Sequence, residues 1–453
     1  MENIKLSEHF TYKKLLRFVM PSIIMMVFVS VYGIVDGFFV SNFVGEIQFA
    51  AINLIYPFIM ILGAVGFMFG AGGNAIVSKV LGEGDGRKAN RLFSLFIYVT
   101  MLSGVILAAL GIAFAKPVAE LFAMTEKSMN AAEKQELIKY CVQYARIILA
   151  TLPAFMLQNA FQGSFVTAEK PRLGLWVTVI AGCGNIVFDA LFVPLLKWGL
   201  VGAAVATAIS QLIGGALPVL YFTRKNGGVL QLGKAELDIR TLCKACGNGL
   251  SELMTNVSFS IVTILYNTQL MRFEGINGVS AYGVVMYVGF IFISVFIGYS
   301  VGSSPIIGYH FGAKNDKELK SILRKSVVIL LMFSVIMTLT GIVFAKPLSM
   351  IFVSGNVELL KLATFGMRTY SLCFLAAGIN IFASSFFTAL SNGVVSLIIS
   401  FSRTLLLQII CVLVLPIWFG LNGIWFSNAV AELLALAITI FFIFLMRKKY
   451  GYL

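Results

Sequence analysis

The stretch Gly111-Ile-Ala-Phe-Ala-Lys-Pro117 recurs 230 positions later as Gly341-Ile-Val-Phe-Ala-Lys-Pro347. The register holds without a gap over roughly 100 surrounding residues, which is the signature of an internal repeat. Identical residues outside this stretch also align, among them Gly45 with Gly275, Gly72 with Gly302 and, at a second offset of 221, Asn159 with Asn380 and Gly199 with Gly420. The chain therefore consists of two copies of one unit, about 21–222 and 251–446.

Each copy is too apolar for a water-soluble fold. Apolar residues make up 59% of the 453 residues and charged residues 12%, and the mean hydropathy is +0.93. A membrane-spanning helix needs roughly 20 mostly apolar residues. Twelve such runs occur, six in each copy, at about 15–43, 52–78, 92–115, 137–163, 173–196, 199–222, 247–272, 279–309, 326–345, 362–388, 394–416 and 421–446. We therefore predict an all-α polytopic membrane protein with twelve transmembrane helices.

The positive charges indicate how these helices are oriented. Most of the 34 Lys and Arg residues fall in the two termini and in the even-numbered loops, which share one side of the membrane. By the positive-inside rule, both termini are cytoplasmic and the protein is a multi-pass component of the cell (plasma or inner) membrane. The net charge of +14 is mainly this orientation signal, so we do not expect nucleic acid as a partner.

Six is an even number, so the second copy enters the membrane in the same orientation as the first. We predict an N-terminal lobe at 1–222, a cytoplasmic linker at 223–246 and a C-terminal lobe with a short basic tail at 247–453. Parallel repeats are related by a pseudo-two-fold axis along the membrane normal, which predicts a cleft between the lobes at mid-membrane.

Acidic side chains within the apolar runs mark the candidate functional site, since each costs about 2.5–3.5 kcal/mol to insert. Asp36 and Asp189 each lie 8 residues from the outer end of their runs, as does Thr207, and Asn185 precedes Asp189 by one helical turn. All are then at similar depth, roughly 12 Å below the outer surface. These oxygen ligands suit a proton or Na⁺. The alternative is that both acids are neutral and only form hydrogen bonds within the lobe.

We expect other roles for the remaining charged residues in the runs. Arg403 and Glu432 lie at comparable depth in neighbouring runs, and we expect a structural ion pair. Glu252 is about 6 residues from the cytoplasmic end of its run, where it can extend toward water or serve as a secondary site. The sequence assigns no role to Arg146 or Arg368.

Several chemistries are disfavoured. No G-x-x-x-x-G-K-[ST] phosphate-binding loop occurs, so we expect an ion gradient to supply the driving force. Cys243-x-x-Cys246 has no second ligand pair, and we expect neither a metal site nor a cofactor. His9 and His310 are the only histidines and both lie at predicted cytoplasmic edges, which argues against an enzyme.

Two six-helix copies, Val35-Asp36-Gly37 in the first run and Asn185-x-x-x-Asp189 in the fifth together resemble the bacterial multidrug and toxic compound extrusion (MATE) family. The resemblance covers nearly the whole chain. It implies export of amphipathic, often cationic drugs, driven by a coupled cation, through a V-shaped cleft between the lobes. The cation site of the family would be Asp36, Asn185, Asp189 and Thr207, and an acid used by another branch corresponds loosely to Glu252.

The resemblance and the charges define the expected function. We expect an H⁺- or Na⁺-coupled antiporter, monomeric in the bilayer, whose substrate is a small amphipathic organic compound. The alternative is a lipid-linked oligosaccharide flippase of the same superfamily, which would need arginines in its cavity to bind a diphosphate. Only three arginines, Arg146, Arg368 and Arg403, lie well inside the runs, and the acids of the first lobe dominate.

The repeat does not preserve the candidate site. At the offsets given above, Asp36 corresponds to Tyr266, Asp189 to Ile410 and Thr207 to Asn428. We therefore predict that the scaffold is duplicated but that the ion-coupling site exists only in the first lobe.

Overall fold

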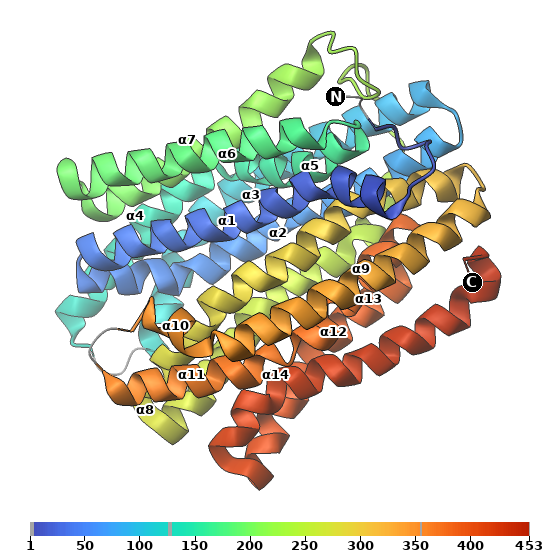
Figure 1. Ribbon diagram of the computed structural model, residues 1–453. Helices are drawn as coiled ribbons and strands as arrows, with labels where there is room; N and C mark the ends of the chain where they lie inside the picture. Colours follow the sequence, from blue (N-terminus) through green and yellow to red (C-terminus); the bar gives the residue numbers. More distant parts are fainter. Residues whose placement is uncertain (1–3, 126–128, 354–355, 453) are drawn as a thin grey trace. The chain divides into compact units, whose positions relative to one another are not determined.

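The computed structural model describes residues 4–125, 129–353 and 356–452, and these residues form helices without any β-strand (Figure 1). The predicted all-α fold is confirmed. In a bilayer a helix is the simplest way for a single segment to satisfy all of its backbone hydrogen bonds.

The helices follow the chain in two series that correspond to the sequence repeat. The first series is α1 (Tyr12–Phe43), α2 (Glu46–Gly82), α3 (Gly86–Thr125), α4 (Ala131–Ala150), α5 (Leu152–Thr167), α6 (Pro171–Ala190), the π-helix η1 (Leu191–Leu195) and α7 (Gly199–Thr223). The second is α8 (Ile239–Gly312), α9 (Asp316–Val343), α10 (Ala345–Met350), α11 (Val357–Ser371), α12 (Phe374–Ala389), α13 (Gly393–Phe401), the π-helix η2 (Ser402–Leu406) and α14 (Leu407–Tyr450).

The number of membrane spans depends on how bent helices are counted. Among the described residues, eight helices are long and apolar enough to cross a membrane, and two pairs bent by 53° (α4 with α5) and 50° (α11 with α12) raise the number to ten. The 74 residues of α8 would extend about 110 Å, far more than the ~30 Å of a hydrocarbon core. Counting α8 and the stretch Gly393–Tyr450 as two spans each agrees with the twelve predicted runs.

Glycines form the breaks in these two long elements. Gly275 has φ 59° and ψ −145°, and Gly420 has φ 55° and ψ −137°, a region that is essentially restricted to glycine. Gly199, which the repeat aligns with Gly420, also has a positive φ of 53°. Gly199 and Gly420 therefore form corresponding breaks for the same backbone reason, whereas Gly45, the counterpart of Gly275, has no positive φ.

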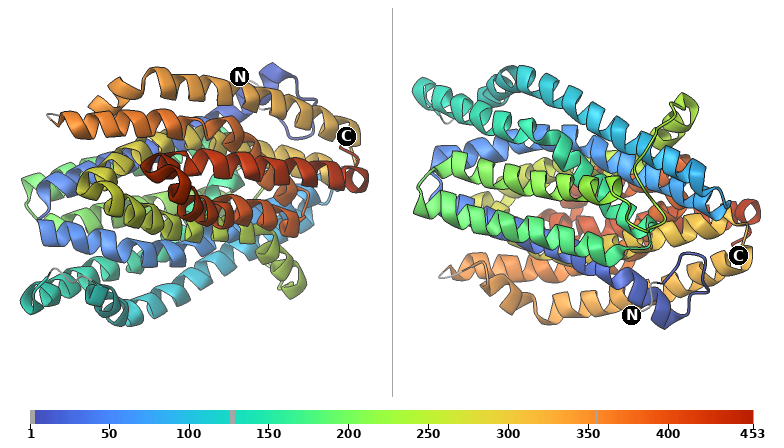
Figure 2. Two further views of the ribbon diagram at one scale, coloured as in Figure 1. Left: turned by 90° about the horizontal axis from the view of Figure 1, so that it is seen from below. Right: turned by 90° about the horizontal axis from the view of Figure 1, so that it is seen from above.

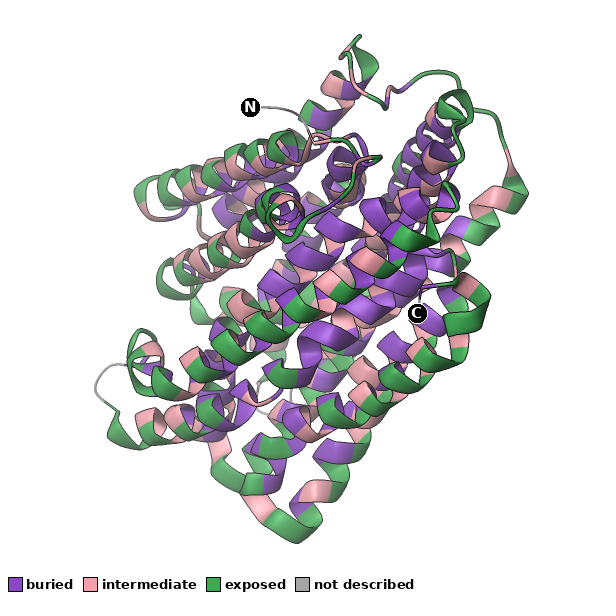
Figure 3. Cartoon of the chain, turned by 45° about the vertical axis from the view of Figure 1, so that its right-hand side comes forward, coloured by how far each residue is buried: buried purple, intermediate pink, exposed green. Residues whose placement is uncertain are grey.

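Within the first lobe, helices pack closely through small residues. A Cβ atom added at Gly66 would lie 2.6 Å from the Met156 backbone, and one added at Gly70 would lie 2.9 Å from Ala160 Cα. Such contacts bring α2 and α5 together in the way that small residues join helices in membranes. Figure 3 shows that most helices carry both buried and exposed residues. Large apolar side chains such as Leu102 are exposed, as expected beside lipid.

The chain forms two compact units whose limits do not coincide with the predicted lobes at 1–222 and 247–453. Residues 28–81 and 85–249 belong to the first unit, and residues 4–27, 82–84 and 250 onward belong to the second. The first half of α1 therefore packs with the second series of helices. Close approaches show this directly, since a Cβ atom at Gly298 would lie 2.5 Å from Ile23 Cα.

The segment predicted as the linker, 223–246, is partly helical. Residues 224–238 contain no helix, and α8 already begins at Ile239 (Figure 2). The non-helical part is fastened to the first unit, where the Gln231 backbone N–H donates to Asn90 Oδ1 at 2.6 Å and the Gly233 N–H to Ser94 Oγ at 2.9 Å. It is therefore an ordered part of the fold and not a loose tether.

The glycine breaks give a direct test of the fold. Nothing lies within 4 Å of a Cβ atom added at Gly420, so Gly420→Ala introduces backbone strain alone, of about 1–3 kcal/mol. We expect a lower unfolding temperature of the purified protein in detergent. Gly283 in α8 has equally open surroundings but no positive φ, and Gly283→Ala should leave the unfolding temperature unchanged or raise it slightly. Equal unfolding temperatures for the two variants would contradict this account.

Candidate functional site

Helices α1 and α6 meet at a glycine, which brings the predicted acids toward each other. A Cβ atom added at Gly182 of α6 would lie 2.6 Å from Phe28 Cε1 and 2.7 Å from Tyr32 Cδ1. Asp36 lies one turn beyond Tyr32 on α1, and Asn185 and Asp189 follow Gly182 on the same side of α6. Only a residue without a side chain at position 182 permits this approach.

The Asp36 and Asp189 carboxyl groups are close enough to interact electrostatically. Asp189 is completely buried and Asn185 is 2% exposed. Asp36 Oδ1, Asn185 Nδ2 and both Asp189 carboxylate oxygens are buried atoms that no hydrogen-bonding partner among the described residues satisfies. Since ionised carboxylates only accept hydrogen bonds, two of them side by side repel unless a proton or a cation is shared between them.

Thr207 lies on α7, which packs antiparallel to α6 (Figure 2). Ser210 Oγ of α7 donates to the Ala181 carbonyl of α6 at 2.9 Å, which fixes the register of the two helices. Thr207 is three residues before Ser210, so it lies at about the level of Asn185. Its side chain is half-buried. The structure thus brings Asp36, Asn185 and Asp189 together and places Thr207 at their level.

Three tyrosines lie near the acids, and the sequence alone did not predict them as residues of the site. Tyr32 of α1, Tyr56 of α2 and Tyr144 of α4 are near enough to Asp36 to interact with it electrostatically, and Tyr144 also interacts with Asp189. Tyr32 was detectable from its position one turn before Asp36. Tyr56 and Tyr144 carry no comparable signal, because their proximity depends on which faces of α2 and α4 turn inward.

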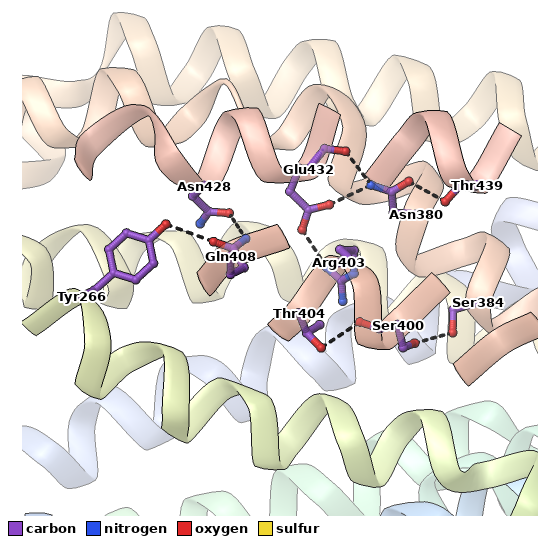
Figure 4. Close-up of polar contacts among 10 residues, drawn as sticks. All are labelled: Tyr266, Asn380, Ser384, Ser400, Arg403, Thr404, Gln408, Asn428, Glu432 and Thr439. Atoms are coloured by element: carbon purple, nitrogen blue, oxygen red, sulfur yellow. Dashed lines mark hydrogen bonds and ion pairs between the residues drawn. The ribbon is translucent and has the colours of Figure 1, made fainter. Parts of the chain in front are cut away.

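The second unit holds its charges in a hydrogen-bonded network (Figure 4). Arg403 Nη1 donates to Glu432 Oε1 at 2.9 Å, so the expected ion pair is present. Asn380 Nδ2 donates to Glu432 Oε2 at 2.8 Å, and Thr439 Oγ1 donates to Asn380 Oδ1 at 2.8 Å. Arg403 itself lies in the π-helix η2, a local widening that the sequence did not predict.

Glu252 belongs to the same charged region. Its half-buried side chain on α8 interacts electrostatically with Arg403, which gives it a partner inside the unit. The sequence also allows Glu252 to extend toward water at the helix end, but in the structure it lies near Arg403. Arg146 of α4 and Arg368 of α11 are exposed.

In the second copy, the counterparts of Asp36 and Thr207 are neutral side chains that share a hydrogen-bonded network, and the counterpart of Asp189 is the apolar Ile410. Tyr266 OH donates to Gln408 Oε1 at 3.0 Å, and Gln408 Nε2 donates to Asn428 Oδ1 at 2.9 Å (Figure 4). Tyr266 also stacks on Tyr282, with ring centroids 5.0 Å apart. The counterpart of Asp36 is therefore a tyrosine in a closed network, whereas the Asp36 region retains buried polar atoms without partners.

Comparison with known proteins defines the class. The MatE family model matches residues 21–191 and 252–414, more than half of the chain, and the chain therefore belongs to this family of efflux transporters. It is a multi-pass membrane protein, as the apolar helices require.

Relatives named as multidrug export proteins agree with this assignment, and so does the similarity to solved structures. The multidrug export protein MepA of Staphylococcus haemolyticus is 24% identical over 442 residues, covering 97% of this chain and 94% of that protein. MepA of Staphylococcus aureus is 22% identical over 449 residues, with the same coverage of 97% and 94%. A crystal structure of a MATE protein in complex with MaL6 superimposes with a TM-score of 0.90 at 20% identity and covers 99% of this chain and 98% of its own.

The ion pair of the second unit can be tested by its thermodynamic coupling. Arg403→Met or Glu432→Gln alone leaves one buried charge unpaired, and we expect each to cost about 3 kcal/mol. The double variant removes both charges and keeps the hydrogen bond from Asn380, so its loss of stability should be well below the sum of the single losses. Unfolding temperatures of the purified variants provide the measurement. Strictly additive losses would contradict a structural pairing.

The approach of α1 to α6 can be tested at Gly182. Gly182→Ala would push Phe28 and Tyr32 away and should cost about 1–3 kcal/mol of stability through overpacking. Gly184 lies on the same helix, but the nearest atom to its added Cβ would be Ile213 Cδ1 at an ordinary 3.5 Å. Gly184→Ala is therefore the matched control and should have little effect on the unfolding temperature. Equal effects at the two positions would show that Gly182 has no special packing role.

Proposed function

We propose that the protein exports small amphipathic organic cations in exchange for H⁺ or Na⁺, and that Asp36 and Asp189 bind the coupling ion. The observation that carries the proposal is the group of buried polar atoms without partners on these two acids and Asn185. A completely buried carboxylate is costly unless a charge compensates it, so this site favours a bound proton or cation.

The ligand types fit this role. Two carboxyl groups, the Asn185 amide and the Thr207 hydroxyl supply oxygen atoms, which hard cations such as Na⁺ prefer. The same acids can instead share a proton. In the second unit, Tyr266 and Asn428, the counterparts of Asp36 and Thr207, are already satisfied through Gln408.

A conformational response can begin in α1. This helix is continuous from Tyr12 to Phe43 in the structure, although it contains Pro21 and has Gly33 and Gly37 on either side of Asp36. Nothing lies within 4 Å of a Cβ atom added at Gly33. Neutralising Asp36 changes the balance of forces on a helix segment with weak packing and low helix propensity, and such segments bend most readily.

The substrate class rests on the relatives, several of which are named multidrug export proteins. We propose alternating access as the transport mechanism, both termini on the cytoplasmic side, and a monomer as the working unit. The flippase alternative is less favoured, because Arg403 is paired with Glu432, and Arg146 and Arg368 lie on exposed helix faces.

Transport in proteoliposomes tests the proposal. An imposed pH gradient or an imposed Na⁺ gradient should drive efflux of a fluorescent amphipathic cation by the wild-type protein. Asp36→Asn and Asp189→Asn should each lower the ion-driven rate about tenfold or more, because the ion then loses its preference for one conformation. Comparing the two gradients identifies the ion.

Glu274→Gln provides the control, since it removes one negative charge from an exposed position of α8. It should transport at the wild-type rate. Full ion-driven efflux by both Asn variants would overturn the proposal. If neither the pH gradient nor the Na⁺ gradient drives transport of an amphipathic cation by the wild-type protein, the result would favour the flippase.

A further inference from the structure

A second candidate site lies at the C-terminal end of α7, away from the acids. It is a surface pocket of about 400 Å³. Its lining consists of Leu217, Leu220, Tyr221, Arg224, Lys225 and Asn226. Thr207 lies more than ten residues earlier on the same helix, about 15 Å or more along its axis. The pocket is therefore separate from the proposed ion site.

One half of the pocket continues an apolar stripe along α7. Leu212 is 49% exposed and Leu220 is 52% exposed, and Ala216 between them is also exposed. These residues are four apart and so share one face of the helix. Because α7 is a spanning helix, this face lies beside the acyl chains of the bilayer.

The other half of the pocket carries two positive charges. Arg224 ends α7 with an extended backbone (φ −82°, ψ 158°), and Lys225 follows it. Both side chains are exposed, and neither forms an ion pair with any residue in the described part of the chain. Nearby Arg91, in contrast, pairs with Glu236 at 2.8 Å. The charges of Arg224 and Lys225 are therefore available to an anion.

The wall of the pocket is ordered by hydrogen bonds. Asn226 Nδ2 donates to the Leu230 carbonyl at 3.1 Å, and Asn226 Oδ1 accepts from the Gly228 N–H at 2.9 Å. Leu230 is completely buried, and the chain beyond it is fastened to Asn90 of α3. The turn that carries the basic pair is thus preformed, which lowers the entropic cost of binding a ligand.

We propose that this pocket binds one acidic phospholipid. Its phosphate would contact Arg224 and Lys225, and an acyl chain would lie along Leu220, Leu217 and Leu212. Basic residues just outside a spanning helix attract anionic headgroups, and guanidinium groups bind phosphate oxygens in pairs. A free phosphate would use the charges but not the apolar stripe. The adjacency of stripe and charges is what identifies a lipid.

Native mass spectrometry of the delipidated protein in detergent tests this proposal with phosphatidylglycerol and with phosphatidylcholine of identical acyl chains. Arg224→Gln/Lys225→Gln should weaken retention of the tightest-bound phosphatidylglycerol about 30-fold, since each basic residue near a membrane surface contributes about fivefold. Retention of phosphatidylcholine should not change. Arg224→Lys/Lys225→Arg keeps both charges and should retain phosphatidylglycerol.

Lys448→Gln/Lys449→Gln is the matched control, because it removes the same charge from exposed positions at the end of α14. It should retain phosphatidylglycerol as the wild type does. An equal loss in this control would show diffuse attraction to the whole basic surface and would overturn the proposal.

The apolar half needs its own test. Leu220→Gln leaves the charges in place and should weaken binding of long-chain phosphatidylglycerol severalfold. Competition by inorganic phosphate as strong as that by the lipid would indicate a site for a free anion and would also overturn the proposal. Both experiments measure lipid binding and not transport, so a negative result would refute the lipid site without bearing on the proposed ion-coupling site. Unfolding temperatures of the variants show whether each one is folded.

Discussion

The need to satisfy backbone hydrogen bonds without water governs this structure. In hydrocarbon, a backbone N–H or C=O group without a partner costs several kcal/mol, so the apolar segments become helices. Where the chain must reverse, as in α8 and α14, the break is confined to one residue. Gly275 and Gly420 provide it, because only glycine adopts that backbone conformation without strain. The sequence repeat thus preserves the glycines of these turns, whereas it does not preserve the acids Asp36 and Asp189.

Polar side chains obey the same constraint, and the two copies satisfy it in opposite ways. The second copy closes its polar groups on one another, through Tyr266, Gln408 and Asn428 and through Arg403 and Glu432. The first copy leaves buried carboxylate oxygens of Asp36 and Asp189 without partners. Polar groups that satisfy one another are suited to rigidity, whereas buried carboxylates without partners are suited to exchange of a ligand.

Hydropathy and the repeat predicted the helical fold and the number of apolar runs, because these properties depend only on distance along the chain. The tyrosines Tyr56 and Tyr144, the proximity of Glu252 to Arg403 and the π-helix at Arg403 were not predicted. The side-chain contacts depend on the rotation of each helix about its axis, and the π-helix depends on a local change of backbone hydrogen bonding. In a protein surrounded by lipid the outer face is as apolar as the core, so the sequence pattern carries little information about that rotation.

The division of α1 between the two units has a consequence for folding and for any attempt to split the chain into two fragments. Residues 4–27 pack with the second series of helices, and residues 239–249 pack with the first. A chain cut within 224–238 would therefore yield two fragments, each lacking a segment that the other carries. We therefore expect each half of the chain to need the other in order to complete its own compact unit.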